Sequence, residues 1–222
     1  MKKIIESTRS LLAWRVQEEQ KASRNGSFEI TSSPTHREHV ISWPAPDSPS
    51  GPPREIEFLH ELVHALLCEQ VHYQFSGHLF ARKTSNEEIQ IAGWACRAAT
   101  DWFVDDELMR LVPDQEKAEI REHFEMILEV FRKGPPKPDI FLLVTAGFVI
   151  AQAIKYLGVQ VPTGGQITQV IDAFLSTPPE NPSVQALEGL INKLLAVYSE
   201  RRVRLVKDGE MEVWEVNRGG KS

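Results

Sequence analysis

The stretch Phe58-Leu-His-Glu-Leu-Val-His-Ala-Leu-Leu67 places two histidines and a glutamate inside a strongly apolar frame. On a helix, His60 and His64 occupy positions i and i+4, so both imidazoles leave the same face one turn apart. This spacing lets two ring nitrogens reach one tetrahedral zinc ion. Glu61 follows about 100° further round the helix, where its carboxylate can reach a metal-bound water. The stretch therefore predicts a helix with two metal ligands, His60 and His64, and one general base, Glu61.

A catalytic zinc site needs a third protein ligand and keeps one position for water. In the extended metzincin pattern, a histidine follows six residues after the second one, but this chain has Gln70 there. That class is therefore excluded. His72 and His78 follow near the end of the predicted helix and in the next loop. We interpret both as rim or loop residues.

The following predicted helix supplies acidic candidates for the third ligand. Asp101 lies among small and apolar residues, and a buried acid needs a partner. That partner is either Arg97, one turn earlier, or zinc. We predict Asp101 as the third ligand. Asp105, one turn later, is placed to accept the ring N–H of a zinc-bound histidine and so to fix its tautomer.

Two other features of this region have local explanations. Ser85 and Glu88 match a helix capping box, which gives Glu88 a structural role. Glu88, or its neighbour Glu87, is therefore kept only as the reserve metal ligand. Cys68 lies one turn after His64, where a buried structural cysteine is a better interpretation than a metal-bound thiolate.

Hydrophobic periodicity and turn residues predict an α+β, mostly helical fold. We expect helices at 2–22, 54–74, 86–112, 114–133, 140–154, 165–176 and 183–199, short strands at 28–31 and 39–43, and a hairpin over 202–215. The apolar helix at 140–154 is too short for a membrane span and is predicted to be buried. The Pro/Gly-rich segment 134–138 predicts two domains, 1–133 and 134–222, with the second packed on the first.

Composition limits the classes of partner and compartment. The 222 residues carry a formal net charge of −6, which favours neither nucleic acid nor an anionic membrane as partner. The N-terminus lacks the clean apolar stretch of a signal peptide. The two cysteines, Cys68 and Cys96, suit a reducing compartment as buried thiols. We therefore expect a cytoplasmic protein.

Residues 28–113 resemble the zincin superfamily of metallopeptidases, in the compact bacterial and phage branch of ImmA/IrrE-like proteins. The resemblance is carried by Ile56–Leu67, which contains His-Glu-x-x-His, and by the ending Leu108-Met-Arg-Leu-Val-Pro113. Asp101 then falls within one residue of the family's ligand glutamate. The segment 99–106 also looks like a phrase of metallopeptidases associated with von Willebrand-type domains. This chain departs from the pattern in having aspartate for glutamate, a longer gap after His64, and Val63 where glycine is common.

The resemblance implies a minimal zincin-like core, in which an active-site helix, a ligand helix and a small sheet precede a helical extension. It implies zinc-dependent hydrolysis of peptide bonds in a protein or peptide substrate, with Glu61 as general base. Three alternatives remain open. One is a zinc-binding regulatory or protein-interaction module with little or no turnover, and another is a zinc enzyme that hydrolyses a different amide. The third is a metal-free helical protein.

Overall fold

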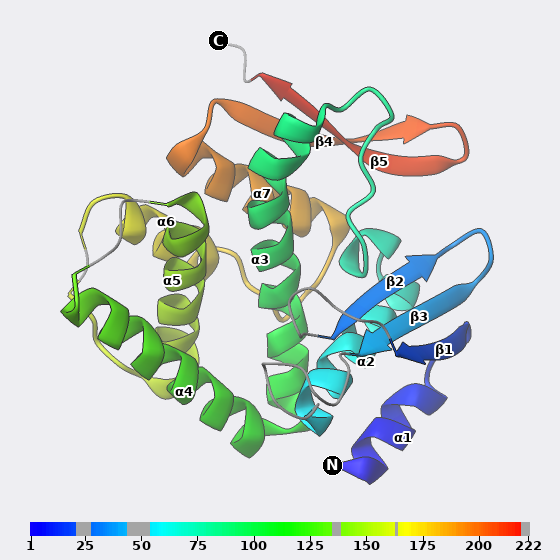
Figure 1. Ribbon diagram of the computed structural model, residues 1–222, viewed down its shortest axis with the longest axis horizontal. Helices are drawn as coiled ribbons and strands as arrows, with labels where there is room; N and C mark the ends of the chain where they lie inside the picture. Colours follow the sequence, from blue (N-terminus) through cyan, green and yellow to red (C-terminus); the bar gives the residue numbers. More distant parts are fainter. Residues whose placement is uncertain (21–27, 44–53, 135–138, 163, 219–222) are drawn as a thin grey trace. The chain divides into compact units, whose positions relative to one another are not determined.

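The computed structural model describes residues 1–20, 28–43, 54–134, 139–162 and 164–218 (Figure 1). The chain forms two compact units, Met1–Gly77 and His78–Ser222. These units do not follow the predicted division at residue 134. Helices on both sides of that residue pack on one another within the second unit. Residues 135–138 of the predicted linker lie outside the described part of the chain.

The first unit combines a small sheet with two helices. Its elements are α1 (Lys2–Ser10), β1 (Arg15–Gln20), β2 (Glu29–Ser33), β3 (Glu38–Trp43), α2 (Glu55–Gln70) and the 3₁₀ turn η1 (Tyr73–Phe75). The sheet has the strand order β1-β3-β2. Strand β3 pairs in parallel with β1, with Arg15 opposite Glu38, and antiparallel with β2, with Ser33 opposite Glu38. The two strands predicted at 28–31 and 39–43 are confirmed.

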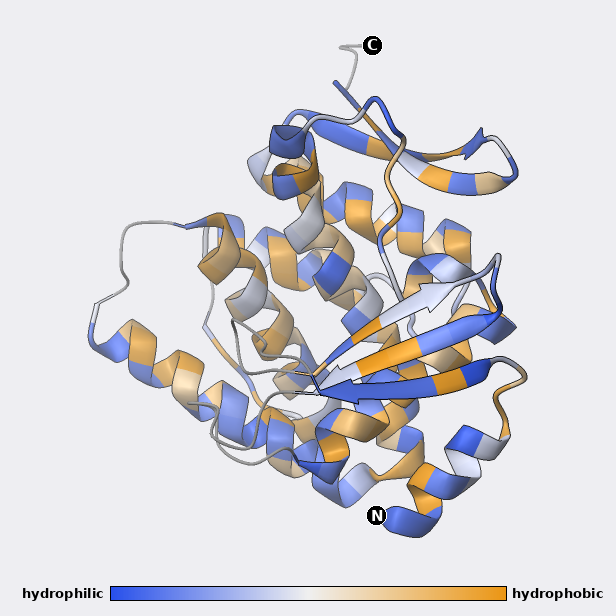
Figure 2. Cartoon of the chain, turned by 45° about the vertical axis from the view of Figure 1, so that its right-hand side comes forward, coloured by the Kyte–Doolittle hydropathy of each residue, from blue (hydrophilic) through white to orange (hydrophobic). Residues whose placement is uncertain are grey.

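The predicted helix at 2–22 is wrong beyond residue 10, because residues 15–20 form β1. This strand is almost entirely hydrophilic (Figure 2). Its arginine, glutamates and glutamines are all good helix formers. The backbone pairing with β3, which comes later in the chain, outweighs this local preference.

Glu69 ties the C-terminal part of α2 to the rest of the first unit. Its carboxylate accepts hydrogen bonds from the backbone N–H groups of Ala13 and Trp14, at 2.7 and 2.9 Å. It also accepts one from the Nε2 of His39, at 3.0 Å. His39 is fully buried on β3, and burial holds the pKa of its imidazole below the ordinary value. On the other side of the ring, the Ser32 hydroxyl lies 2.6 Å from Nδ1.

The second unit is built of helices and ends in a hairpin. Its elements are α3 (Asn86–Leu111), α4 (Pro113–Arg132), α5 (Ile140–Gln152), the π-helical turn η2 (Ala153–Leu157), α6 (Gln166–Leu175), α7 (Val184–Tyr198), β4 (Arg201–Asp208) and β5 (Met211–Arg218). Each predicted helix of this region and the hairpin are confirmed. Helix α4 carries apolar and hydrophilic residues in alternation along its length (Figure 2), as an amphipathic helix does.

The core of this unit lies where α3, α5, α6 and α7 meet. The buried Trp102 of α3 packs against Phe148 and Phe174, and its indole N–H donates to the carbonyl of Thr177 at 2.9 Å. Helices α5 and α6 touch at Gly147. A Cβ added there would lie 2.3 Å from a methyl carbon of Val170, so only glycine allows this approach.

The hairpin holds the start of α3. Arg201 donates to the Glu88 carboxylate at 2.8 Å, and Trp214 exchanges backbone hydrogen bonds with Leu79 and Ala81. Glu215, at the same end of the unit, accepts hydrogen bonds from Lys83 and from Asn217. These partners, the lysine above all, lower the pKa of Glu215 to about 2.

Among the described residues, one helical stretch is long and apolar enough to span a membrane, Ile140–Leu157. This test is also passed by core helices of soluble proteins. The side chains of Val144, Val149 and Ile150 are buried in the second unit against neighbouring helices. Over the whole stretch, 44% is buried.

Candidate metal centre

Helix α2 presents His60 and His64 from an otherwise buried frame. Leu59, Leu62 and Val63 are completely buried, and they fix the rotation of the helix in the core of the first unit. His64 is itself buried, whereas His60 is half-buried. The rigid helix therefore sets the spacing of the two imidazoles, as the sequence predicted.

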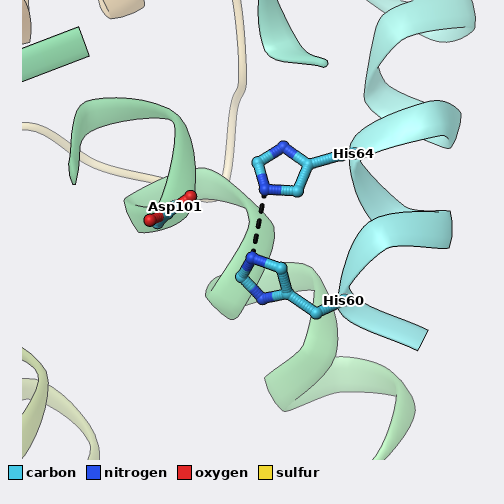
Figure 3. A group of neighbouring side chains, drawn as sticks. All are labelled: His60, His64 and Asp101. Carbon is cyan, nitrogen blue, oxygen red and sulfur yellow. Dashed lines mark hydrogen bonds between the residues drawn. The ribbon is translucent and has the colours of Figure 1, made fainter. Parts of the chain in front are cut away.

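The two imidazoles point their Nε2 atoms at each other. These atoms lie 3.0 Å apart, and the rings meet edge to face with centroids 4.8 Å apart (Figure 3). On the other side of His64, Nδ1 lies 2.5 Å from the backbone carbonyl oxygen of Phe75. A carbonyl only accepts, so Nδ1 carries the proton and Nε2 offers its lone pair. His60 then donates its Nε2–H to that lone pair when no metal is present.

This arrangement fits the donor set that zinc requires. Zinc–nitrogen bonds of about 2.0–2.1 Å in a tetrahedral site place two nitrogens about 3.3 Å apart. The two Nε2 atoms need only separate by about 0.3 Å to reach that spacing. A metal-bound histidine usually donates its second ring N–H to an oxygen acceptor, and the Phe75 carbonyl provides one for His64.

Asp101 joins the two histidines in a group of three residues that can hold a metal ion (Figure 3). One ligand atom from each lies within 4.8 Å of the other two. In the described part of the chain, no other group of three histidines, cysteines or acids meets this test.

Arg97, the alternative partner predicted for Asp101, does not form an ion pair with it. Arg97 forms no ion pair with any described residue, and its guanidinium lies over the ring of Trp94 at 5.5 Å from the centroid. Asp105 is buried and accepts a 2.6 Å hydrogen bond from the amide of Gln152 on α5. Its role toward a zinc-bound histidine stays a prediction. For His64, that role belongs to the Phe75 carbonyl.

The reserve ligands have other partners or lie outside the group of three. Glu88 completes the predicted capping box with Ser85 and also binds Arg201. The Ser85 backbone N–H and hydroxyl, with the arginine, hold the pKa of Glu88 below its ordinary value. Glu87 is exposed in the first turn of α3. Neither glutamate belongs to the group formed with His60 and His64.

His72 and Cys68 also have local roles. The ring of His72 accepts a hydrogen bond from the backbone N–H of Gln74 and so caps η1. Cys68 is a buried free thiol, and burial raises its pKa. A raised pKa disfavours the thiolate that a metal would need. Cys68 is thus the buried cysteine that the sequence predicted, and His72 lies in the turn after α2, where it was predicted as a loop or rim residue.

Sequence reasoning missed the Phe75 carbonyl and Gln152. The first is a backbone group, which no side-chain pattern can reveal. The second lies 47 residues from Asp105 along the chain, on a helix that the predicted division assigned to another domain. Comparison of the chain with known protein families, with curated proteins and with solved structures found no match.

Proposed function

We propose that the protein is a zinc-dependent metallopeptidase, with His60, His64 and Asp101 as zinc ligands. The observation that carries this proposal is the pair of Nε2 atoms 3.0 Å apart on α2, with the tautomer of His64 set by the Phe75 carbonyl. Two Nε2 atoms this close on one helix face, one of them with its lone pair turned toward the other ring, provide two nitrogen ligands for a divalent metal.

In this proposal, zinc, Glu61 and Asp101 have separate chemical roles. Zinc, when bound, supplies a water whose pKa is lowered toward about 7 and an electrophile for the peptide carbonyl. Glu61, which lies between the two ligands in the motif, would act as the general base that accepts a proton from the attacking water and as the acid that returns it to the leaving amine. The fourth residue of the site, Asp101, neutralises part of the charge of the ion.

Other properties of the chain agree with a cytoplasmic enzyme that acts on peptides. Cys68 and Cys96 are both free and buried, as thiols in a reducing compartment usually are. The net charge of −6 offers no attraction for the phosphates of nucleic acid or anionic lipid.

The decisive experiment measures zinc and turnover in the same preparations. We expect about one equivalent of zinc in the wild type, far less in His64→Ala, and an unchanged content in Glu61→Gln. Peptide-library cleavage should be present in the wild type and absent from both variants. Glu57→Gln, a change to an exposed glutamate on the same helix, is the matched control.

Three results would contradict the proposal. Less than a tenth of an equivalent of zinc after reconstitution would rule out the metal site. A Glu61→Gln variant with unimpaired biological activity would point to a zinc-binding interaction module. Hydrolysis of small amides without any peptide cleavage would point to a different class of amide hydrolase.

A further inference from the structure

A cavity of about 290 Å³ opens beside Asp101 within the second unit. It lies between α3, α4 and α5, and most of its lining is apolar. The side chains that define it are those of Trp94, Ala98, Met126, Phe141, Val144 and Phe148. Ligand pockets usually measure about 300–1,000 Å³, so this one suits a single large side chain.

Two aromatic rings form the mouth of this cavity. The rings of Trp94 and Phe141 lie 4.6 Å apart, and both side chains are more than a third exposed. Met126 beside them is 52% exposed. Three large apolar side chains left open around one hollow form an apolar surface that gains free energy when a ligand covers it.

Arg97 gives the cavity a positive charge at its rim. Its guanidinium rests on Trp94, and no described carboxylate pairs with it. A guanidinium beside an aromatic ring does not use its N–H donors on that ring, and these donors match a carboxylate in bidentate geometry. The other polar groups of the lining are Asp101, His123 and Thr145. Only Arg97 is a permanent cation.

We propose that this cavity binds the C-terminal residue of a peptide, with a large apolar side chain inside and the free α-carboxylate on Arg97. The inference rests on the proposed peptidase function and narrows it to a carboxypeptidase. The reaction adds water to the last peptide bond: the C–N bond breaks, the carbonyl carbon gains the water oxygen, and the leaving amine takes a proton. The products are a shortened peptide and a free apolar amino acid.

Arg97 and Asp101 both line the cavity and lie four residues apart on one face of α3. The Arg97 guanidinium lies over Trp94, three residues toward the start of the helix, and so at the end of the cavity away from Asp101. A terminal residue whose carboxylate binds Arg97 therefore points its peptide bond toward the Asp101 end of the cavity.

A binding experiment tests the cavity without any turnover. N-acetyl-phenylalanine and its amide would be titrated by calorimetry or NMR into full-length Asp101→Asn, which removes the negative charge from the cavity and keeps its shape. We expect the acid to bind at least tenfold more tightly than the amide. Arg97→Gln should abolish this preference, and Arg97→Lys should retain part of it. Arg121→Gln, an exposed arginine on α4, should change nothing.

The apolar part of the cavity has its own control. Phe141 is exposed at the mouth, so Phe141→Ala should leave the fold intact and weaken the acid and the amide by the same factor. Equal affinities of Asp101→Asn for N-acetyl-phenylalanine and for its amide would overturn the proposal. So would a preference for the acid that survives Arg97→Gln.

Turnover separates this inference from the proposed function. The zinc-loaded wild type should cleave peptides that end in a free phenylalanine and spare the same peptides when amidated. Cleavage of both at internal bonds would keep the peptidase and overturn the carboxypeptidase. No cleavage or zinc binding at all, with the acid still preferred by Asp101→Asn, would overturn the peptidase and keep the binding site.

Discussion

Replacing Glu69 with glutamine tests whether one carboxylate fixes α2 to its sheet. The carboxylate is only 9% exposed and accepts three hydrogen bonds. One oxygen serves Trp14 and His39, and the other serves Ala13. The amide of glutamine keeps one acceptor oxygen. Its best orientation retains the first two bonds and turns an NH₂ toward the backbone N–H of Ala13.

The cost follows from these bonds. Loss of a hydrogen bond to a charged acceptor removes about 1.5–3 kcal/mol. The two remaining bonds lose their charge assistance, which makes each about half as strong. We therefore expect Glu69→Gln to lower the free energy of unfolding by about 3 kcal/mol. Glu69→Ala leaves all three donors without this acceptor, among them the fully buried His39, and should cost still more.

Urea denaturation followed by far-UV circular dichroism measures this effect. The midpoint should fall while the slope m stays unchanged, because the surface exposed on unfolding is the same. Glu57→Gln on the same helix loses the ion pair with Arg54, but its amide oxygen can still accept the Arg54 backbone N–H in the capping box, so it should stay within about 0.5 kcal/mol of the wild type. If Glu69→Gln costs no more than this control, Glu69 does not fasten the helix.

Three further changes probe the second unit. Gly147→Ala should lower the free energy of unfolding by about 1–3 kcal/mol, because the added methyl group would overpack against α6. Gly93→Ala has open space where its Cβ would lie and should raise the free energy of unfolding by about 0.4–1 kcal/mol. Equal effects of the two changes in urea denaturation would contradict the close approach of α5 and α6. Tyr156→Phe leaves a carboxylate oxygen of Asp106 without its 2.7 Å donor and should cost about 1–3 kcal/mol in the same assay, and no loss would show that this bond is not needed. The pKa of Glu215 is lowered from 4.5 to about 2, so the stabilisation of the fold by its carboxylate is complete above pH 4.5 and disappears as the pH falls toward 2. Across that range, the melting temperature should fall more steeply for the wild type than for Glu215→Gln. Parallel curves would refute the lowered pKa of Glu215.

Local patterns were enough to predict the helices that carry the candidate site. The apolar stripe of α2 and the capping box at Ser85 are properties of neighbouring residues. Helix α3 lies where these patterns placed it, and α2 begins where predicted but ends at Gln70, four residues early. The i, i+4 spacing of His60 and His64 likewise needs only a helix to bring two nitrogens together. Each of these features depends only on residues that lie within one or two helical turns of one another in the sequence.

The features that the sequence could not predict depend on distant partners. Strand β1 has the composition of a helix and becomes a strand through β3. The two compact units divide at Gly77, where no Pro/Gly-rich linker marks a boundary. The Pro/Gly-rich segment at 134–138 is not a boundary, because α4 and α5 on its two sides pack against each other. The acceptor for His64 is a backbone carbonyl, whose position follows only from the path of the chain after α2.

The bonds between the hairpin and the start of α3 also set the order in which the second unit can be completed. Arg201 and Trp214 meet Glu88 and Ala81 across more than a hundred residues of chain. On the ribosome, these hairpin residues leave the exit tunnel after all of α3 to α7 has emerged. The N-terminal end of α3, the helix that carries Asp101, therefore lacks these restraints until β4 and β5 have been synthesised.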